Sequence, residues 1–309
     1  MPTPSFTGRD IISVSDFSKE ELLFILKTVD QLKKNPSSQS LLNGLLMASC
    51  FFESSTRTRL SFEAAALKLG GSVMGFADPK VTSSKKGETL YDSIKIIGQY
   101  ADVVVIRHPL DGSARLAAEA TDKPVINAGD GANQHPTQTL LDLYTIKESQ
   151  KKFDGLSIAM VGDLKNGRTV HSLTQALAHF NVRLYFVAPT SLQLPAHLCN
   201  DIRARHIKYS FHESLDDVIK KVDVLYMTRI QGERFADQSE YERVKDTFVL
   251  APQQLEGVKK NLAVLHPLPR VSEIHSAVDA TPHAWYFKQA FNGLAVRQAL
   301  LALVLGKIS

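Results

Sequence analysis

Short apolar segments of strand length alternate with segments of helical periodicity along the chain, and this alternation limits the possible folds. The expected strands are 46–52, 72–76, 102–106, 124–127, 156–161, 182–187, 222–227 and 262–265. The expected helices include one ending near Lys34 and those at 59–69, 88–100, 136–149, 168–180 and 293–306. Such alternation predicts parallel sheets with helices on both faces. We therefore expect an α/β protein with two domains, each a mostly parallel sheet flanked by helices.

Length and composition indicate an ordinary globular protein. A chain of 309 residues favours two domains, and the polar stretch 148–152 at the end of the helix 136–149 is the expected boundary. Hydrophobic residues make up 44% and charged residues 22% of the chain. The sequence has no signal-peptide pattern and no apolar run of the roughly 18 residues that a membrane span needs. We expect no membrane partner and a cytoplasmic location.

The cysteines and the charge distribution limit the kinds of ligand and partner that the protein is expected to bind. Cys50 and Cys199 are the two cysteines of the sequence, and they lack ligand spacing, so we expect no disulfide framework and no metal site. The net charge is +4, but the lysines form scattered doublets and no continuous basic stripe. Nucleic-acid binding is therefore not indicated. Small anionic substrates fit this charge better, and no cofactor is expected.

The segment Ser54–Arg59 breaks the usual rules for the start of a helix. Serine and threonine suit an N-cap, but Arg57 and Arg59 do not suit the first turn, because that end of a helix already carries about half a positive charge. A multiply charged anion would remove the conflict by accepting backbone N–H, hydroxyl and guanidinium hydrogen bonds. The segment therefore predicts a phosphate-binding site. The alternative is an exposed polar turn with solvated arginines.

Other polar groups follow the expected strands directly. Arg107 follows 102–106, the Gly-rich loop 128–135 follows 124–127, and similar groups follow the strands of the second half: Arg168, Arg229, Gln231 and 266–270. Ligands of parallel α/β sheets bind beyond the carboxyl ends of the strands. The sequence therefore predicts that these groups serve one shared site, although each arginine taken alone could be a surface ion pair.

Several motifs resemble those of the carbamoyltransferase family. Ser55-Thr56-Arg57-Thr58-Arg59 and His135-Pro136-Thr137-Gln138 are similar to its two shared motifs. Others resemble the members that use aspartate, in particular the catalytic chain of the bacterial type; they lie at 85–89, 162–172, 226–231 and 266–270. Members that use ornithine carry a cysteine in place of Pro267. The resemblance covers essentially the whole chain.

The resemblance implies a particular reaction and assigns one substrate to each domain. The carbamoyl group of carbamoyl phosphate would pass to the amine of L-aspartate, giving N-carbamoyl-L-aspartate and phosphate, an early step of de novo pyrimidine biosynthesis. Residues 1–137 with the C-terminal helix 290–309 would bind carbamoyl phosphate, and 150–286 would bind aspartate. The family also implies a homotrimer whose subunits share active sites. Whether regulatory chains associate stays open.

Roles for individual residues also follow from the resemblance. The expected carbamoyl phosphate ligands are Ser55, Thr56, Arg57, Thr58, Ser83, Arg107, His135, Gln138, Pro267 and Leu268. The expected aspartate ligands are Lys86, Arg168, Arg229 and Gln231. The expected catalytic residues are Arg57, Thr58, Lys86, Arg107 and His135. Ser83 and Lys86 would reach into the site of a neighbouring subunit.

The chemistry needs no protein nucleophile, because the amine attacks the carbamoyl carbon directly. Arg107 and His135 can donate to the developing oxyanion. We hypothesise that His135 is a neutral donor and that the departing phosphate takes the proton; His135 as the base is the alternative. Other functions left open are a carbamoyltransferase for another amino acid and an inactive homologue that acts as an assembly partner. A nucleotide-binding module is disfavoured, because 162–167 lacks the dinucleotide spacing.

Overall fold

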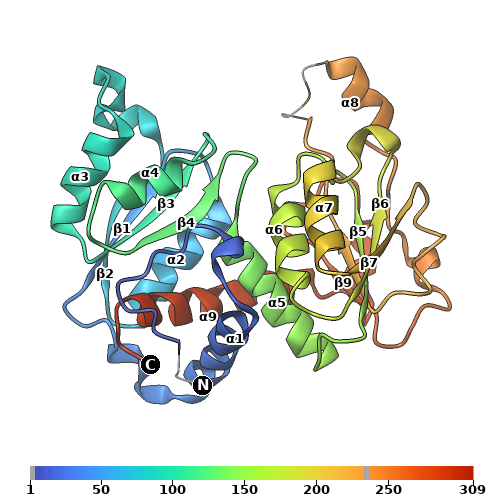
Figure 1. The fold of residues 1–309 in the computed structure, drawn as a ribbon, viewed down its shortest axis with the longest axis horizontal. Helices are drawn as coiled ribbons and strands as arrows, with labels where there is room; N and C mark the ends of the chain where they lie inside the picture. The colour runs from blue at the N-terminus through green and yellow to red at the C-terminus, as the bar shows by residue number, and fades with distance from the viewer. Residues whose placement is uncertain (1–3, 233–234, 236, 309) are drawn as a thin grey trace. The chain divides into compact units, whose positions relative to one another are not determined.

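The computed structural model describes residues 4–232, 235 and 237–308. The chain forms two compact units, one of the residues up to Leu140 together with those from Asn292 onward, and one of Leu141–Phe291 (Figure 1). The divisions fall inside two helices, α5 (Pro136–Gln150) and α9 (Tyr286–Val304). Each unit is a parallel sheet with helices packed against it, so the predicted two-part α/β fold is confirmed.

The first unit contains a parallel sheet of the order β2-β1-β3-β4 among the described residues. Its strands are β1 (Leu46–Phe51), β2 (Ser72–Phe76), β3 (Val103–His108) and β4 (Val125–Asp130). Its helices include α1 (Lys19–Lys34), α2 (Thr56–Lys68), α3 (Leu90–Tyr100) and α4 (Ser113–Glu119). Phe51 pairs with Arg107, and His108 pairs with Asp130. The loops after β1, β3 and β4 therefore leave the sheet at the same edge.

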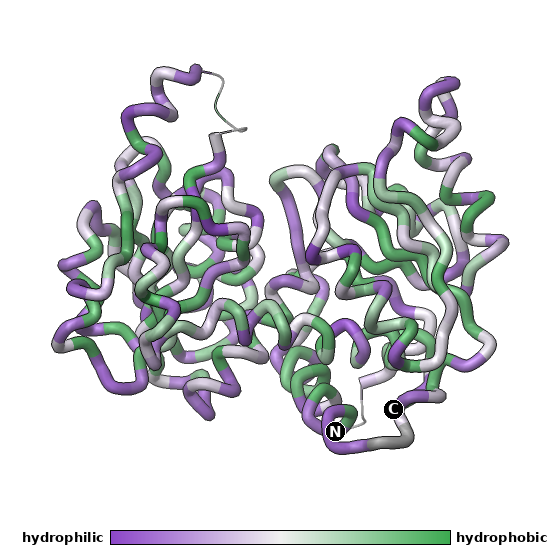
Figure 2. The backbone as a smooth tube through the Cα atoms, turned by 180° about the vertical axis from the view of Figure 1, so that it is seen from behind, coloured by the Kyte–Doolittle hydropathy of each residue, from purple (hydrophilic) through white to green (hydrophobic). Residues whose placement is uncertain are grey.

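Strand alternation builds the core of this unit. Cys50 and Ile106 face the same side of the sheet, where they pack in one buried cluster with Ile94 of α3 and Ala117 of α4. The central strands β1 and β3 are mainly hydrophobic and buried, as expected for strands covered on both faces, and hydrophobic segments recur through the interior of the chain (Figure 2).

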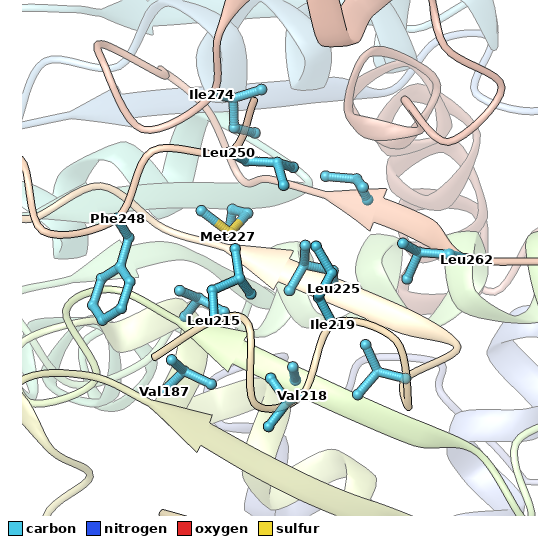
Figure 3. Close-up of a cluster of buried hydrophobic side chains, with 14 of the residues drawn as sticks. Val187, Leu215, Val218, Ile219, Leu225, Met227, Phe248, Leu250, Leu262 and Ile274 are labelled. Atoms are coloured by element: carbon cyan, nitrogen blue, oxygen red, sulfur yellow. The ribbon is translucent and has the colours of Figure 1, made fainter. Parts of the chain in front are cut away.

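The second unit contains a parallel sheet of the order β7-β6-β5-β8-β9 in the part of the chain described. Its strands are β5 (Ser157–Val161), β6 (Arg183–Val187), β7 (Lys208–His212), β8 (Val224–Met227) and β9 (Ala263–Leu265). Its helices include α6 (Arg168–Leu177), α7 (Ala196–Ala204) and α8 (Gln238–Val244). On one face, Leu225 and Met227 pack with Leu215, Leu250 and Ile274 in a buried cluster (Figure 3).

Some elements were not predicted. The strand β7 lies at the edge of its sheet and has the partly exposed pattern of such a strand, so it lacks an apolar run. The loop 77–87 contains two short 3-10 turns, η3 (Pro79–Val81) and η4 (Ser83–Lys86). The helix α9 begins earlier than the expected start at 293. Within the described residues, no helix has both the length and the apolar character to cross a membrane.

Candidate active site

The first turn of α2 lacks the usual features of a helix start. Ser55 is the N-cap, but among the described residues its side chain makes no capping hydrogen bond, and the first turn contains no acidic residue. In contrast, α1 has a complete capping box, in which Ser18 and Glu21 bond to each other's backbone N–H groups. The chain therefore stabilises one helix start with its own side chains and leaves the other suited to an anion.

Arg57 lies in this first turn and is exposed to solvent. Within the described residues it has no ion pair, whereas Arg59 lies 3.8 Å from Glu63 on the same helix. The surrounding protein desolvates the Arg57 guanidinium enough to lower its pKa, although an arginine remains charged at neutral pH. Thr58 in the same turn is buried. Arg57 is therefore a cation available to a ligand.

Arg107 lies at the end of β3 and contacts two groups near the start of α2 and the end of β4. Its Nη2 lies 2.8 Å from Oε2 of Glu53, and its Nη1 donates to the carbonyl oxygen of Ala128 at 3.3 Å. These contacts fix the guanidinium at the carboxyl edge of the sheet. Sequence analysis missed Glu53, whose only signal was its position between β1 and the predicted phosphate-binding segment.

Asp130 holds the loop that leads to His135. Its buried carboxylate accepts hydrogen bonds from the backbone N–H groups of Gly112 and Gln134 at 2.9 and 3.1 Å. It also accepts from the side-chain amides of Asn127 and Asn133, at 2.9 and 3.1 Å. A loop without regular structure is thereby given a fixed conformation.

His135 and Gln138 lie at the start of α5 and are both buried. His135 directly precedes this helix, and Gln138 follows one turn later, so the Asp130 loop and α5 together position them. The structure thus places the predicted groups in the first unit, with Arg107 at the end of β3 and the others at the helix starts that follow β1 and β4: Ser55–Thr58, His135 and Gln138.

Ser83 and Lys86 are not joined to this group. Both lie in the exposed turn η4, which Gly87 ends with a left-handed φ of 91°. Within the described chain, neither forms a hydrogen bond or ion pair with the other predicted site residues.

In the second unit, Arg168 begins a second helix without a conventional cap. The N-cap of α6 is Gly167, and within the described residues the first turn of α6 contains no acid and no side-chain cap. Two glycines allow close packing here: a Cβ on Gly162 would lie 2.2 Å from the carbonyl oxygen of Thr228, and one on Gly167 would lie 2.5 Å from that of Asp163. Larger residues would push Arg168 away from the end of β5.

Arg229 and Gln231 follow β8 directly, at the same edge of the sheet as Arg168. The side-chain amide of Gln231 donates to the carbonyl oxygen of Asn166 at 3.3 Å. Asn166 is itself fixed by the buried carboxylate of Asp163, which accepts its backbone N–H at 2.9 Å. The loops after β5 and β8 are therefore joined, and both present cations to the same side.

The turn after β9 is shaped by His266. Its Nδ1 accepts the backbone N–H of Leu268 at 2.8 Å, so the proton is on Nε2, which donates to Glu273 at 2.7 Å. Leu268 has a φ of 58°, which is uncommon for a residue with a side chain. The buried pair of His266 and Glu273 holds the backbone of Pro267 and Leu268 in this conformation.

Glu273→Gln is expected to weaken the acid dependence of stability. Burial alone would raise the pKa of Glu273, but hydrogen bonds from His266 and the backbone lower it overall. A lowered pKa contributes stability that is complete above the unfolded value of about 4.5 and is lost as the pH falls through the folded value. The variant should lose on the order of 1–2 kcal/mol at pH 7 and show a smaller further loss below pH 4.5. Urea midpoints between pH 7 and pH 3 check this; a parallel decline in both proteins would contradict it.

The sequence matches the models of one protein family along nearly the whole chain. Residues 9–148 match the family model described as "Aspartate/ornithine carbamoyltransferase, carbamoyl-P binding domain", and residues 154–304 match the "Asp/Orn binding domain" of the same family. The chain belongs to the aspartate/ornithine carbamoyltransferase family.

Within this family, the chain is similar to proteins that are named aspartate carbamoyltransferase or aspartate transcarbamoylase. The aspartate carbamoyltransferase catalytic subunit of Vibrio campbellii is 57% identical over 306 residues, which are 98% of each chain. The catalytic subunit of M. jannaschii aspartate transcarbamoylase has 50% identity and a TM-score of 0.89, covering 96% of this chain and 98% of that one. The Trypanosoma cruzi aspartate transcarbamoylase in complex with carbamoyl phosphate and aspartate has 37% identity and a TM-score of 0.92, covering 98% and 100%.

Proposed function

We propose that this protein transfers the carbamoyl group of carbamoyl phosphate to the amine of L-aspartate, releasing N-carbamoyl-L-aspartate and phosphate. The observation that carries the proposal is Arg57, a cation without an ion pair among the described residues, in the first turn of an uncapped helix. A dianionic phosphate satisfies both features. The names of the relatives, and the ligands of the Trypanosoma cruzi enzyme, support the choice of substrates.

The first unit supplies most of the groups proposed for carbamoyl phosphate, and Pro267 and Leu268 come from the second unit. Ser55, Thr56, Arg57 and Thr58 are proposed to hold the phosphate through hydroxyls, the guanidinium and the N–H groups at the start of α2. Arg107 and His135, with Thr58, are proposed to donate to the carbonyl oxygen. The proposed ligands of the carbamoyl NH2 group are Gln138 and the backbone of Pro267 and Leu268. Glu53 already orients Arg107 for this role.

The reaction is an attack of the neutral amine on the carbamoyl carbon. A C–N bond forms, the C–O bond to phosphate breaks, and phosphate leaves with the electron pair. The developing negative charge on the carbonyl oxygen is stabilised by Arg107 and His135, in positions fixed before the reaction. The amine proton passes to the departing phosphate, which is the strongest base formed. The protein's contribution is therefore positioning and electrostatic stabilisation.

The second unit supplies cations for a dicarboxylate. Arg168 and Arg229 are proposed to bind the two carboxylates of L-aspartate, with Gln231 as an additional ligand. Guanidinium groups recognise carboxylates with two parallel hydrogen bonds, which favours an acidic amino acid over ornithine. The charged groups of both units are present, which argues against an inactive homologue.

The assembly is also a proposal. We propose a homotrimer in the cytoplasm, in which Ser83 and Lys86 serve the site of a neighbouring subunit and Lys86 contacts aspartate. Their place in an exposed turn, with no hydrogen bond or ion pair to the other predicted groups within the described chain, supports this role. Cys50 and Cys199 are free thiols, as suits a reducing compartment. Regulatory chains are a further possible partner, to be tested by the mass of the assembly in solution.

The direct test is phosphate release from carbamoyl phosphate in the presence of L-aspartate or L-ornithine. Release that depends on aspartate supports the proposal. Release that depends on ornithine would indicate a carbamoyltransferase for another amino acid. No release with either amino acid would support the alternative that the protein is an inactive homologue acting as an assembly partner.

Arg229→Ala is expected to raise the KM for aspartate by on the order of 10- to 100-fold, because a charge-assisted hydrogen bond to a carboxylate is lost. The affinity for carbamoyl phosphate, measured by calorimetry without aspartate, should change less than about twofold. Arg205→Ala is the matched control, because Arg205 is exposed in the same unit and has no assigned role. An equal loss of affinity for both substrates would contradict the division between the two units.

A further inference from the structure

The proposed mechanism gives no role to a group of polar side chains inside the second unit. Tyr226 and Asp142 have an exposed fraction of 0%, and Gln289 has 1%. They lie on β8, α5 and α9. Burying such groups is costly unless their hydrogen bonds are made, and an apolar core would fill the space at less cost. Their presence therefore calls for an explanation other than simple packing.

These groups form a continuous hydrogen-bonded chain. The Tyr226 hydroxyl donates to Oδ2 of Asp142 at 2.8 Å, and Nε2 of Gln289 donates to Oδ1 of the same carboxylate at 2.6 Å. Oε1 of Gln289 accepts the backbone N–H of His266 at 2.8 Å. At the other end, the side chain of Thr169 is hydrogen-bonded to Tyr226. We call the set Thr169, Tyr226, Asp142, Gln289 and His266 the buried polar chain.

The direction of each bond is determined. Since Tyr226 gives its only proton to Asp142, its oxygen is the acceptor for the Thr169 hydroxyl. Burial, and then the nearby Asp142 carboxylate, raise the pKa of Tyr226 well above its ordinary value, so the phenol keeps its proton. A chain of bonds with a fixed direction specifies distances and angles, which hydrophobic contacts do not.

Both ends of the buried polar chain adjoin residues proposed to bind substrate. Thr169 follows Arg168 in the first turn of α6. His266 precedes Pro267 and holds the N–H of Leu268. In the middle, Tyr226 pairs in register with Met160 of β5 and Leu265 of β9, so it lies level with the ends of both neighbouring strands.

We propose that Tyr226, held by Asp142 and Gln289, is a positioning residue that fixes the start of α6 and the turn after β9 relative to the end of β8. It touches no substrate and acts through the placement of Arg168, Arg229 and the backbone of Leu268. This inference rests on the proposed function, because it concerns the geometry of the aspartate-binding groups.

Tyr226→Phe removes one oxygen and keeps the ring. The loss of the central link should raise the KM for aspartate by on the order of 10- to 100-fold, since small displacements of binding groups have effects of this size. The affinity for carbamoyl phosphate should fall less than the affinity for aspartate, because most of its proposed ligands lie in the first unit and only Pro267 and Leu268 adjoin the buried polar chain. Tyr185→Phe is the matched control: Tyr185 is buried in the same sheet, but on the opposite face, where it packs in the hydrophobic cluster with Leu225 and Met227.

Thr169 provides a second, milder pair of variants. Thr169→Val keeps the shape and removes the hydroxyl, whereas Thr169→Ser keeps the hydroxyl. The valine variant should raise the KM for aspartate, and the serine variant should restore a value near that of the wild type. The Tyr226→Phe and Thr169→Val changes act on one bond, so the double variant should be no worse than Tyr226→Phe alone. If Tyr226→Phe does not fold, the comparison of Thr169→Val with Thr169→Ser still tests the inference.

Three results would overturn the inference. They are an unchanged KM for aspartate in both Tyr226→Phe and Thr169→Val, an equal rise in Tyr185→Phe, and an equal loss of carbamoyl phosphate affinity. Phosphate release by the wild-type protein distinguishes a failure of this inference from a failure of the proposed function. If the wild type releases no phosphate with aspartate, the proposed function fails and the inference falls with it. Normal wild-type turnover with unaffected variants overturns the inference alone.

Discussion

Arg57→Ala is expected to lower the turnover of carbamoyl phosphate and aspartate by on the order of 10²- to 10³-fold, the typical effect of removing one donor that stabilises transition-state charge. Arg57 is exposed, and among the described residues it has no ion pair, so its removal breaks no salt bridge of that part of the chain. The melting temperature should therefore stay nearly constant. Steady-state phosphate release and thermal unfolding, measured on the same preparation, check both parts of this expectation.

Arg115→Ala is a suitable control for Arg57→Ala. Arg115 belongs to the same unit, is well exposed and forms an ion pair with Asp16, 3.1 Å away, so its removal takes away one positive charge at a site with no proposed role. If Arg57→Ala and Arg115→Ala had the same turnover, the anion-binding role of the α2 start would be refuted. A large fall in melting temperature with normal turnover would point instead to a structural role.

Asp130→Ala is expected to give the largest loss of stability, on the order of 3–5 kcal/mol, because four donors, two of them in buried hydrogen bonds, lose their acceptor at once. The donors are the four groups bonded to the Asp130 carboxylate in the loop before His135. Urea unfolding at neutral pH measures the loss. Activity should fall as well, even under conditions that keep the variant folded, since His135 and Gln138 depend on this loop for their positions.

A comparison with two other variants isolates the role of the carboxylate. Asp130→Asn keeps one acceptor oxygen and should lie between the wild type and Asp130→Ala. Asp122→Ala removes an exposed carboxylate from the same unit and should change stability by no more than about 0.5 kcal/mol. A normal urea midpoint for Asp130→Ala would mean that water replaces the carboxylate without cost, and the loop would then have another anchor.

The regular elements with buried, periodic sequences were predictable. The expected strand 46–52 is β1 (Leu46–Phe51), and the expected helix 136–149 is α5 (Pro136–Gln150). Both carry their signal within the segment itself, as continuous hydrophobicity or as Pro136 at a helix start. The edge strand β7 was missed because it is stabilised by pairing with β6, a long-range interaction that no local pattern reveals.

The residues proposed to face the substrates carry a clearer sequence signal than the residues that hold them. Arg57 and Arg168 stand out in sequence because cations conflict with a helix start. Asp130 and Tyr226 give no such signal, since an isolated aspartate or a tyrosine in a strand is common. Their importance comes from contacts between segments far apart in sequence, such as that between Tyr226 and Asp142. Supporting networks of this kind become visible only in the folded chain.

If the uncapped starts of α2 and α6 bind the two substrates as proposed, the lifetime of the folded protein depends on metabolite supply. An anion that binds to the folded chain and not to the unfolded one adds about 2.7 kcal/mol of stability at a concentration 100 times its Kd. That gain corresponds to a roughly hundredfold smaller unfolded population. Cells short of the two substrates would therefore expose this chain to proteases far more often than well-supplied cells. The abundance of the enzyme would then follow the supply of its substrates, without any change in transcription.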